Sequence, residues 1–304
     1  MHRSNHRVPG DATVRPPNAV RANAGRTTGT ARRLLVGLAG ALLALPALTV
    51  VGAGPAGAVN TKYAAIVTDS SGSGYWLVQA GGAVHQHGDA PALGNTGCDP
   101  TFTAPAVGAV ATSDHLGLWE VNAKGAVACF GDAGFYGSAG HLVLNMPIVG
   151  ITATPSGHGY WMVASDGGIF AWGDATFYGS EAGVTVVKPI VGMAATPDGL
   201  GYWEVGSSGV VYRFGDAVLF GTPSSHSHIV AMSATPDGLG YWVLDKNGVV
   251  SNFGDAAPLG WTTVTSSQRM VSMSIIASGA GYWELGLHGF VWPHGTAVSY
   301  GNGP

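Results

Sequence analysis

An aromatic pair recurs six times along this chain at a nearly constant spacing. It is Tyr-Trp in five copies and Leu-Trp in the second: Tyr75-Trp76, Leu118-Trp119, Tyr160-Trp161, Tyr202-Trp203, Tyr241-Trp242 and Tyr282-Trp283. Successive tryptophans lie 43, 42, 42, 39 and 41 residues apart. A Gly-Asp-Ala triplet follows each of the first five pairs with its acid 13 residues after the Trp, and Thr296 takes that place in the sixth. Such self-similarity is the signature of a repeat architecture, so the chain must fold as six like units.

Each copy divides into four short apolar segments separated by turn residues. In the copy that begins at Pro189, the segments are 189–195, 201–205, 210–214 and 218–221. The first turn, Thr196-Pro197-Asp198-Gly199, combines a proline that presets φ with a glycine that supplies φ > 0. Runs of this length, rich in aromatic and β-branched residues, are typical of strands. We therefore predict four strands per copy.

Four strands in about 42 residues make a unit the size of a propeller blade. Blades pack against neighbours on both faces, so Tyr202 and Trp203 can both be buried although they point to opposite faces. The predicted fold is an all-β, six-bladed β-propeller of four-stranded repeats. The alternative is an open β-solenoid or spiral, which normally needs atypical capping copies. The sequence leaves open how the ring would close.

Residues 1–58 differ in kind from residues 59–304. The first 33 residues hold seven arginines and one acid, and an apolar run from Leu34 to about Gly54 follows. A basic leader, an apolar stretch and the ending Ala56-Gly57-Ala58 predict a secretory signal peptide cleaved after Ala58. The alternative is an uncleaved membrane anchor. Arg32-Arg33 leaves the general and the twin-arginine export routes both open.

Removal of the leader changes the charge of the chain. The leader holds seven of the 13 Lys and Arg but one of the 17 Asp and Glu, so residues 59–304 carry a net charge of −10. This acidity argues against nucleic acid and anionic membranes as partners. Both cysteines of the chain, Cys98 and Cys129, lie in this part. We predict that they form a disulfide in an oxidising compartment, with two buried thiols as the alternative.

The repeat itself resembles a known group of sequences. The pattern Pro-Ile-Val-Gly-x-x-Ala-Thr-Pro-Asp-Gly, then Gly-Tyr-Trp, then Gly-Asp-Ala is similar to the secreted Gly-Tyr-Trp/Gly-Asp-Ala repeats of actinobacterial extracellular proteins. The resemblance covers residues 63–301. In that family the repeats often accompany hydrolase or cell-wall domains and have no established activity of their own. The resemblance therefore implies an architecture and an extracellular setting, and it names no ligand.

The residue after each tryptophan alternates between apolar and acidic. Copies two, four and six carry Glu120, Glu204 and Glu284, whereas copies one, three and five carry Leu77, Met162 and Val243. In a closed ring this alternation would give three acids with threefold symmetry. One hypothesis is that they converge on a metal ion or a cationic ligand near the channel. The alternative is three independent acids at solvated or paired positions.

Histidine replaces Phe or Trp at a second position that recurs in every copy. Eleven residues after each Trp the chain has an aromatic hydrocarbon in copies two to five, but His87 in the first copy and His294 in the sixth. His85 shares a strand face with His87. Copies one and six would be neighbours in a ring, so one hypothesis is a transition-metal or pH-sensitive seam formed by His85, His87 and His294. The alternative is histidine replacing an aromatic residue at a less tightly packed closure.

The sequence contains no recognisable catalytic constellation, since it has neither a Gly-x-Ser-x-Gly elbow nor a His-Glu-x-x-His motif. The Trp residues are interpreted as blade core rather than sugar platforms, because they recur in every copy. We predict a secreted, non-catalytic binding or scaffold domain without a cofactor, acting on the cell wall, an extracellular polysaccharide or an extracellular protein. The alternative is a propeller hydrolase or lyase with acids at the channel mouth.

Overall fold

Each copy of the repeat forms one antiparallel sheet of three strands. The computed structural model describes residues 63–103, 105–183, 189–224 and 228–304. The predicted signal peptide, residues 1–58, lies outside the described residues. No helix in the described ranges has the length and apolar character needed to cross a membrane. One short 3-10 helix, η1 (Ser266–Gln268), lies between the fifth and sixth sheets.

The strands of each sheet follow the order of the chain. The first strands are β1 (Tyr63–Thr68), β4 (Ala106–Ala111), β7 (Ile148–Ala153), β10 (Ile190–Ala195), β13 (Ile229–Ala234) and β16 (Met270–Ile275). The middle strands are β2 (Gly74–Gln79), β5 (Gly117–Asn122), β8 (Gly159–Ala164), β11 (Gly201–Gly206), β14 (Gly240–Asp245) and β17 (Gly281–Gly286). The third strands are β3 (Val84–Gly88), β6 (Val127–Gly131), β9 (Ile169–Gly173), β12 (Val211–Gly215), β15 (Val250–Gly254) and β18 (Val291–Gly295).

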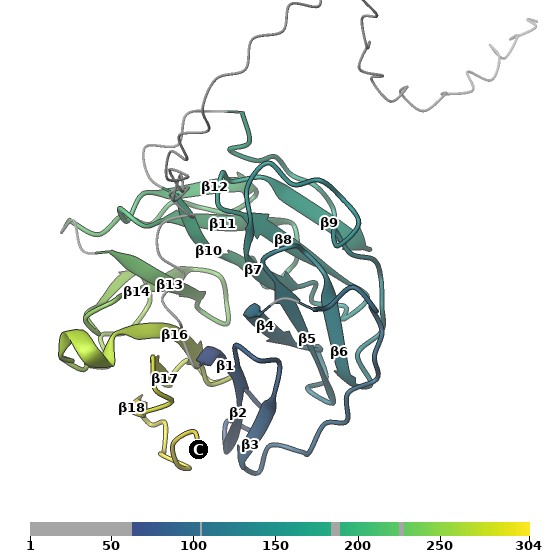
Figure 1. Ribbon diagram of the computed structural model, residues 1–304. Coiled ribbons are helices and arrows are strands. Elements are labelled where there is room, and N and C mark those ends of the chain that lie inside the picture. The colour runs from purple at the N-terminus through teal and green to yellow at the C-terminus, as the bar shows by residue number, and fades with distance from the viewer. Residues whose placement is uncertain (1–62, 104, 184–188, 225–227) are drawn as a thin grey trace, which may run out of the picture. The chain divides into compact units, whose positions relative to one another are not determined.

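The first strands of the six sheets contact one another in sequence and close a ring. β4 lies between β1 and β7, the pattern continues through β10 and β13, and β16 contacts β1 (Figure 1). The Oγ atoms of Ser272 and Ser274 on β16 accept hydrogen bonds from the backbone N–H groups of Ile66 and Thr68 on β1. The chain is therefore a six-bladed β-propeller, as predicted, and the open solenoid is excluded.

The predicted fourth strand of each blade is absent from the sheets, and this part of the prediction was wrong. Residues 218–221, for example, join no ladder in the described structure. The segment is held by side chains instead. The indole N–H of Trp203 donates to the carbonyl of Val218, 15 residues later, and the other five tryptophans make the same bond. We call these six segments straps.

Each strap also binds the next blade. The hydroxyl of Tyr202 donates to the carbonyl of Gly179, which lies three residues beyond the carbonyl that accepts from Trp161. The same bond joins four other pairs: Tyr75 with Gly301, Tyr160 with Gly137, Tyr241 with Gly221 and Tyr282 with Gly260. Gly179 has a φ of +132°, and a Cβ there would lie 2.8 Å from the Phe214 ring. Glycine is therefore required where the strap crosses the neighbouring blade.

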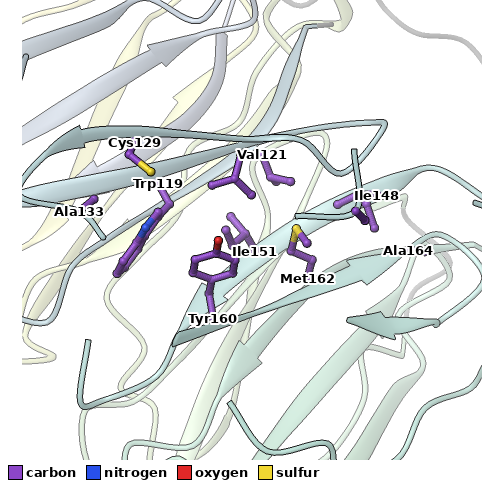
Figure 2. Close-up of a cluster of buried hydrophobic side chains, with 11 residues drawn as sticks. Trp119, Val121, Cys129, Ala133, Ile148, Ile151, Tyr160, Met162 and Ala164 are labelled. Atoms are coloured by element: carbon purple, nitrogen blue, oxygen red, sulfur yellow. The ribbon is translucent and has the colours of Figure 1, made fainter. Parts of the chain in front are cut away.

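The hydrophobic core lies between blades. In Figure 2 Trp119 of the second blade faces Tyr160 of the third, with Val121, Ile148 and Met162 around them. The ring centroids of Trp119 and Tyr160 are 5.4 Å apart. All six tryptophans of the repeated pairs are at most 1% exposed, so their burial confirms that they form blade core. Large aromatic side chains at each interface contribute most of the apolar area that stabilises such a fold.

The second blade replaces the missing tyrosine hydroxyl with covalent and backbone contacts. Leu118 stands where the other copies have tyrosine, and it has no group to donate to the first strap. There, the carbonyl of Gly94 accepts from the N–H of Gly131, and Cys98 forms the predicted disulfide with Cys129 on β6. The disulfide therefore ties the segment after the first blade to the second blade, at the interface that lacks the tyrosine bond.

Candidate functional site

Every first strand carries a β-bulge near its beginning. In the fourth blade, Ile190 pairs with Gly206 and Gly192 pairs with Val205, which leaves Val191 as the extra residue. The same irregularity occurs in the other five sheets. Bulges change the direction of a side chain and are frequent next to functional sites. The six extra residues form what we call the bulge ring: Ala64, Val107, Val149, Val191, Val230 and Val271.

All members of the bulge ring line one cavity of about 820 Å³. The cavity lies where the first strands begin, and we call it the channel-mouth cavity. Its walls also include the turn between the middle and third strands of several blades, for example Gly81, Ser207 and Leu287. Small-molecule sites are typically concave, mostly apolar and of roughly 300–1,000 Å³. Both the size and the apolar wall of this cavity match that class of site.

Three basic residues line one side of the cavity. His228 lies directly before β13, Arg269 directly before β16, and Lys246 in the turn between β14 and β15. Two backbone bonds fix their positions: the N–H of Lys246 donates to the carbonyl of His228, and the N–H of Met270 donates to the carbonyl of Lys246, each at 2.9 Å. The Lys246 Nζ lies 3.2 Å from His228 Nδ1. The cluster is therefore held on a fixed backbone.

Most of the other blades carry neutral residues at the positions of this cluster; the exception is Lys62, which directly precedes the first blade in the sequence and lies outside the described residues. The residue before the first strand is Pro105, Pro147 and Pro189 in blades two to four. The residue after the middle strand, where Lys246 stands in blade five, is Ala80, Ala123, Ser165, Ser207 and Leu287 in the other blades. The ring scaffold therefore does not require a cation at these positions. Because Lys246 and Arg269 belong to the adjacent blades five and six, their charges lie on one side and make the described lining of the cavity asymmetric.

Acidic residues concentrate at the opposite end of the blades. The turns between first and middle strands, together with the turns after the third strands, hold nine aspartates: Asp69, Asp89, Asp114, Asp132, Asp174, Asp198, Asp216, Asp237 and Asp255. These described turns contain no lysine or arginine. Of the described residues that line the channel-mouth cavity, none is an aspartate or a glutamate. The two ends of the propeller therefore differ in charge.

Side chains in the acidic turns mostly hold the turns themselves. In the third blade the Asp174 carboxylate accepts hydrogen bonds from the hydroxyls of Thr154 and Ser156, which joins the two turns of one blade. In the fourth blade Asp198 and Asp216 face each other, and this proximity contributes to a raised pKa at Asp216 after the larger effect of burial. These acids explain the recurrence of Gly-Asp-Ala as a structural feature of the repeat.

The three glutamates predicted to converge lie at three different blade interfaces. Glu120 faces the turn at Gly82 of the first blade, and Glu204 faces the turn at Gly167 of the third. Glu284 lies 3.4 Å from His294 of its own blade. Among the residues that the structure describes, no group of three or more histidine, cysteine, aspartate or glutamate side chains is arranged to hold a metal ion. The structure therefore does not bring these carboxylates together.

Burial dominates the chemistry of these glutamates. Glu120, Glu204 and Glu284 are fully buried, and neither oxygen of Glu120 or Glu204 accepts a hydrogen bond within the described protein. Desolvation raises the pKa of Glu120 and of Glu204 to about 8. Burial also raises the pKa of Glu284, against a smaller opposing effect of His294. At neutral pH the first two are carboxylic acids inside the fold, and none of the three lines the channel-mouth cavity.

The predicted histidine seam is divided between two interfaces. His87 stacks on Tyr75 with ring centroids 5.3 Å apart and faces Gly301, at the closure between blades six and one. The His294 ring packs at a tilt against Tyr282, with ring centroids 5.1 Å apart, and its Nε2 lies 3.1 Å from the Thr262 hydroxyl at the interface between blades five and six. The Nε2 atoms of His85 and His87 are buried without a hydrogen bond in the described structure, and burial lowers the pKa of His87. His294 therefore does not join the other two.

The channel-mouth cavity is not predictable from local sequence patterns. Its wall comes from the second residue of each first strand, inside an unbroken apolar run such as Ile190-Val191-Gly192. No local pattern marks which of these residues is bulged. A comparison of the copies would have singled out Lys246, because it replaces small or apolar residues at an otherwise regular position, whereas the position of Arg269 is proline only in blades two to four.

Comparisons with known proteins support the fold and do not identify a family. No family model matches the chain, and no curated protein does. The chain is similar to a crystal structure of the β-propeller domain of Cps50 (Swd1) from Myceliophteria thermophila, with a TM-score of 0.52 and 11% sequence identity. The similarity covers 80% of this chain and 87% of that one. At such low identity it establishes that the two chains share the β-propeller fold.

Proposed function

We propose that this chain is an exported, non-catalytic binding module whose ligand site is the channel-mouth cavity. The observation that carries the proposal is a cavity of about 820 Å³ with an apolar wall built by one bulge residue from each of six blades. A rigid ring with a preformed concave site binds ligand at low cost in conformational entropy. Its partner is a component of the cell wall, an extracellular polysaccharide or an extracellular protein.

Export is supported by two features. The sequence begins with a basic leader, an apolar run and a small-residue ending, which is the pattern of a signal peptide. The Cys98–Cys129 disulfide suits an oxidising compartment. The similarity of the repeats to secreted actinobacterial repeats agrees with both. We place the mature protein outside the cell, with residues 59–304 as the propeller domain.

The alternative of a propeller hydrolase or lyase depended on acids at the channel mouth. The described lining of the cavity contains no carboxylate, and the three glutamates first considered for this role are buried between blades. A general acid or base must come within hydrogen-bond reach of its substrate. No observation therefore favours this second function over binding.

Retention on natural matrices tests the proposal. The protein, produced from the full chain in an exporting host, is incubated with isolated cell walls, insoluble polysaccharides and immobilised extracellular proteins, beside a heat-unfolded sample. Val191→Trp projects an indole into the cavity and narrows it, and Val298→Trp, at a position 55% exposed and outside the cavity, is the matched control. We expect saturable retention of the wild type and of the control on one matrix, and its loss in Val191→Trp. Equal retention of all folded variants would contradict the proposed site.

A further inference from the structure

The channel-mouth cavity is lined by positively charged residues, whereas the domain as a whole is negatively charged. Residues 59–304 carry six Lys and Arg against 16 Asp and Glu. Four of these cations, Lys124, Arg213, Lys246 and Arg269, lie in the described ranges, and two of the four line the cavity. Because cations are scarce in this domain, two of them on one side of the same cavity, next to His228, mark a place where negative charge is favoured.

The position of the cations relative to the apolar wall limits the ligand further. Lys246 and Arg269 come from neighbouring blades five and six, whereas the bulge ring surrounds the whole cavity. A ligand that fills the cavity would therefore meet valine and alanine side chains over most of its surface and cations at one edge. An apolar body buries its surface against the wall, and an anionic group at one end pairs with the guanidinium and the ammonium.

We infer that the channel-mouth cavity binds an anionic amphiphile, that is, an apolar chain or ring system with one terminal carboxylate or phosphate. This inference rests on the proposed function, because it names the ligand class of the same cavity. Arg269 supplies a planar donor that binds either head group through two hydrogen bonds, and Lys246 supplies a point charge. The bulge ring receives the apolar body. Polysaccharides without acidic groups fit this lining poorly, because apart from the His228 imidazole the only aromatic ring among its described residues belongs to the buried Tyr63.

Titration calorimetry with four probes tests the ligand class. Dodecanoate and dodecyl phosphate, below their micellar concentrations, carry the two possible head groups on one chain; 1-dodecanol lacks the charge, and acetate lacks the chain. We expect saturable one-to-one binding of dodecanoate, dodecyl phosphate or both, at least ten-fold tighter than dodecanol, and no measurable binding of acetate. The tighter of the two anions identifies the head group. Equal affinity for dodecanol and both anions would overturn the inference.

Variants locate the binding. The double substitution Lys246→Ala with Arg269→Ala is expected to weaken the bound anion at least ten-fold and to leave dodecanol unchanged. Lys124→Ala, which removes a cation outside this cavity, is the matched control and keeps wild-type affinity. Val191→Trp, which narrows the cavity, is expected to weaken binding of every probe at least ten-fold, and Val149→Trp, from the neighbouring blade, repeats the test if the first variant does not fold. An unchanged affinity in the double variant would disprove the role of the cations.

The two proposals fail in different ways. If Val191→Trp removes retention on a natural matrix while neither anion binds the wild type, the cavity is the site and the amphiphile inference alone is wrong. If Val191→Trp leaves retention intact, the proposed function itself is wrong at this site. Thermal unfolding of each variant confirms that it is folded before its binding is compared.

Discussion

The hydroxyl of Tyr75 donates a hydrogen bond of 2.5 Å to the carbonyl of Gly301, 226 residues later in the chain. This is the same bond that Tyr202 makes with Gly179 only 23 residues away. The ring therefore closes through the same contact that joins other neighbouring blades. The first blade binds the strap of the sixth blade, as the fourth blade binds the strap of the third. The C-terminal residues continue the contact, since the carbonyl of Pro304 accepts from the hydroxyl of Tyr63.

Loss of the Tyr75 hydroxyl should destabilise the ring as much as loss of an internal one. Tyr75→Phe removes the hydrogen bond donated to the Gly301 carbonyl and the one accepted from the Tyr300 N–H. Tyr241→Phe likewise removes the bond donated to the Gly221 carbonyl and those accepted from the N–H groups of Phe220 and Gly221. We expect each to lower the free energy of unfolding by about 1–2 kcal/mol in urea denaturation. Deletion of residues 300–304 should cost more, because it also removes the Tyr300 ring that packs on Trp283. If Tyr75→Phe were neutral while Tyr241→Phe was costly, the closure would differ from the other interfaces.

The disulfide should contribute more than any single hydrogen bond. Cys98 and Cys129 are 31 residues apart, so their link restricts a loop of that length in the unfolded chain. Chain-entropy arguments assign about 3–4 kcal/mol to such a loop. Replacing both cysteines by serine should lower the free energy of unfolding by this amount, measured as a shift in the urea midpoint. Thiol labelling of the unfolded wild type with and without reductant is the control, and labelling without reductant would contradict the bond.

Stability should decrease as the pH rises through the neutral range. Burial raises the pKa of Glu120 and Glu204 from 4.5 to about 8, so the folded protein retains a proton on each where the unfolded chain has released it. Below about pH 4.5 both states are protonated, and this contribution to stability is fully present. Between pH 4.5 and 8 each group lowers the free energy of unfolding by about 1.4 kcal/mol per pH unit, and above pH 8 the loss is complete.

Glutamine substitution isolates this effect. Glu120→Gln combined with Glu204→Gln keeps the shape of both side chains and removes the titration, so the free energy of unfolding should vary less between pH 5 and 8. Asp89→Asn, which changes an exposed acid in a turn, is the matched control and should keep the wild-type slope. A slope unchanged by the double substitution would mean that other groups govern the pH dependence.

The predicted signal peptide is tested by the N-terminus of the exported protein. Cleavage after Ala58 predicts Val59 as its first residue. Intact-mass measurement on protein recovered from the medium distinguishes this from other sites. Retention of the full chain in the membrane fraction would instead favour the uncleaved anchor.

The Glu120, Glu204 and Glu284 pattern shows where prediction from the repeat failed. The alternation is real, and it correctly places the three acids at equivalent positions in alternate blades. Their side chains nevertheless point into interfaces between blades, because each shares a strand face with the aromatic or leucine residue two positions earlier. That face packs against the preceding blade, as the Tyr202 contact with Gly179 shows. Equivalent positions in a ring are related by rotation, and rotation alone does not bring them to its axis.

The straps show a similar limit. The apolar segment at 218–221 resembles a strand in its composition, yet Trp203 and Tyr241 hold it through an indole and a hydroxyl. Composition predicts extended backbone, but it does not predict which groups hydrogen-bond to that backbone, here Trp203 of the same blade and Tyr241 of the next.

The sequence by itself determined the number of blades, their turns and their buried aromatic residues, because a period near 42 residues and a Tyr-Trp pair in most copies are properties of local order. It also marked the cysteines that pair. Only the tertiary structure decided which residues line the channel, how the ring closes and where the charges collect. Val191 and Val149 line the same cavity because of the bulges and the closed ring. Arg269 and Lys246 line one side of it because blades five and six are adjacent. Contacts between residues distant in sequence arise from the packing of whole blades, so no local pattern encodes them.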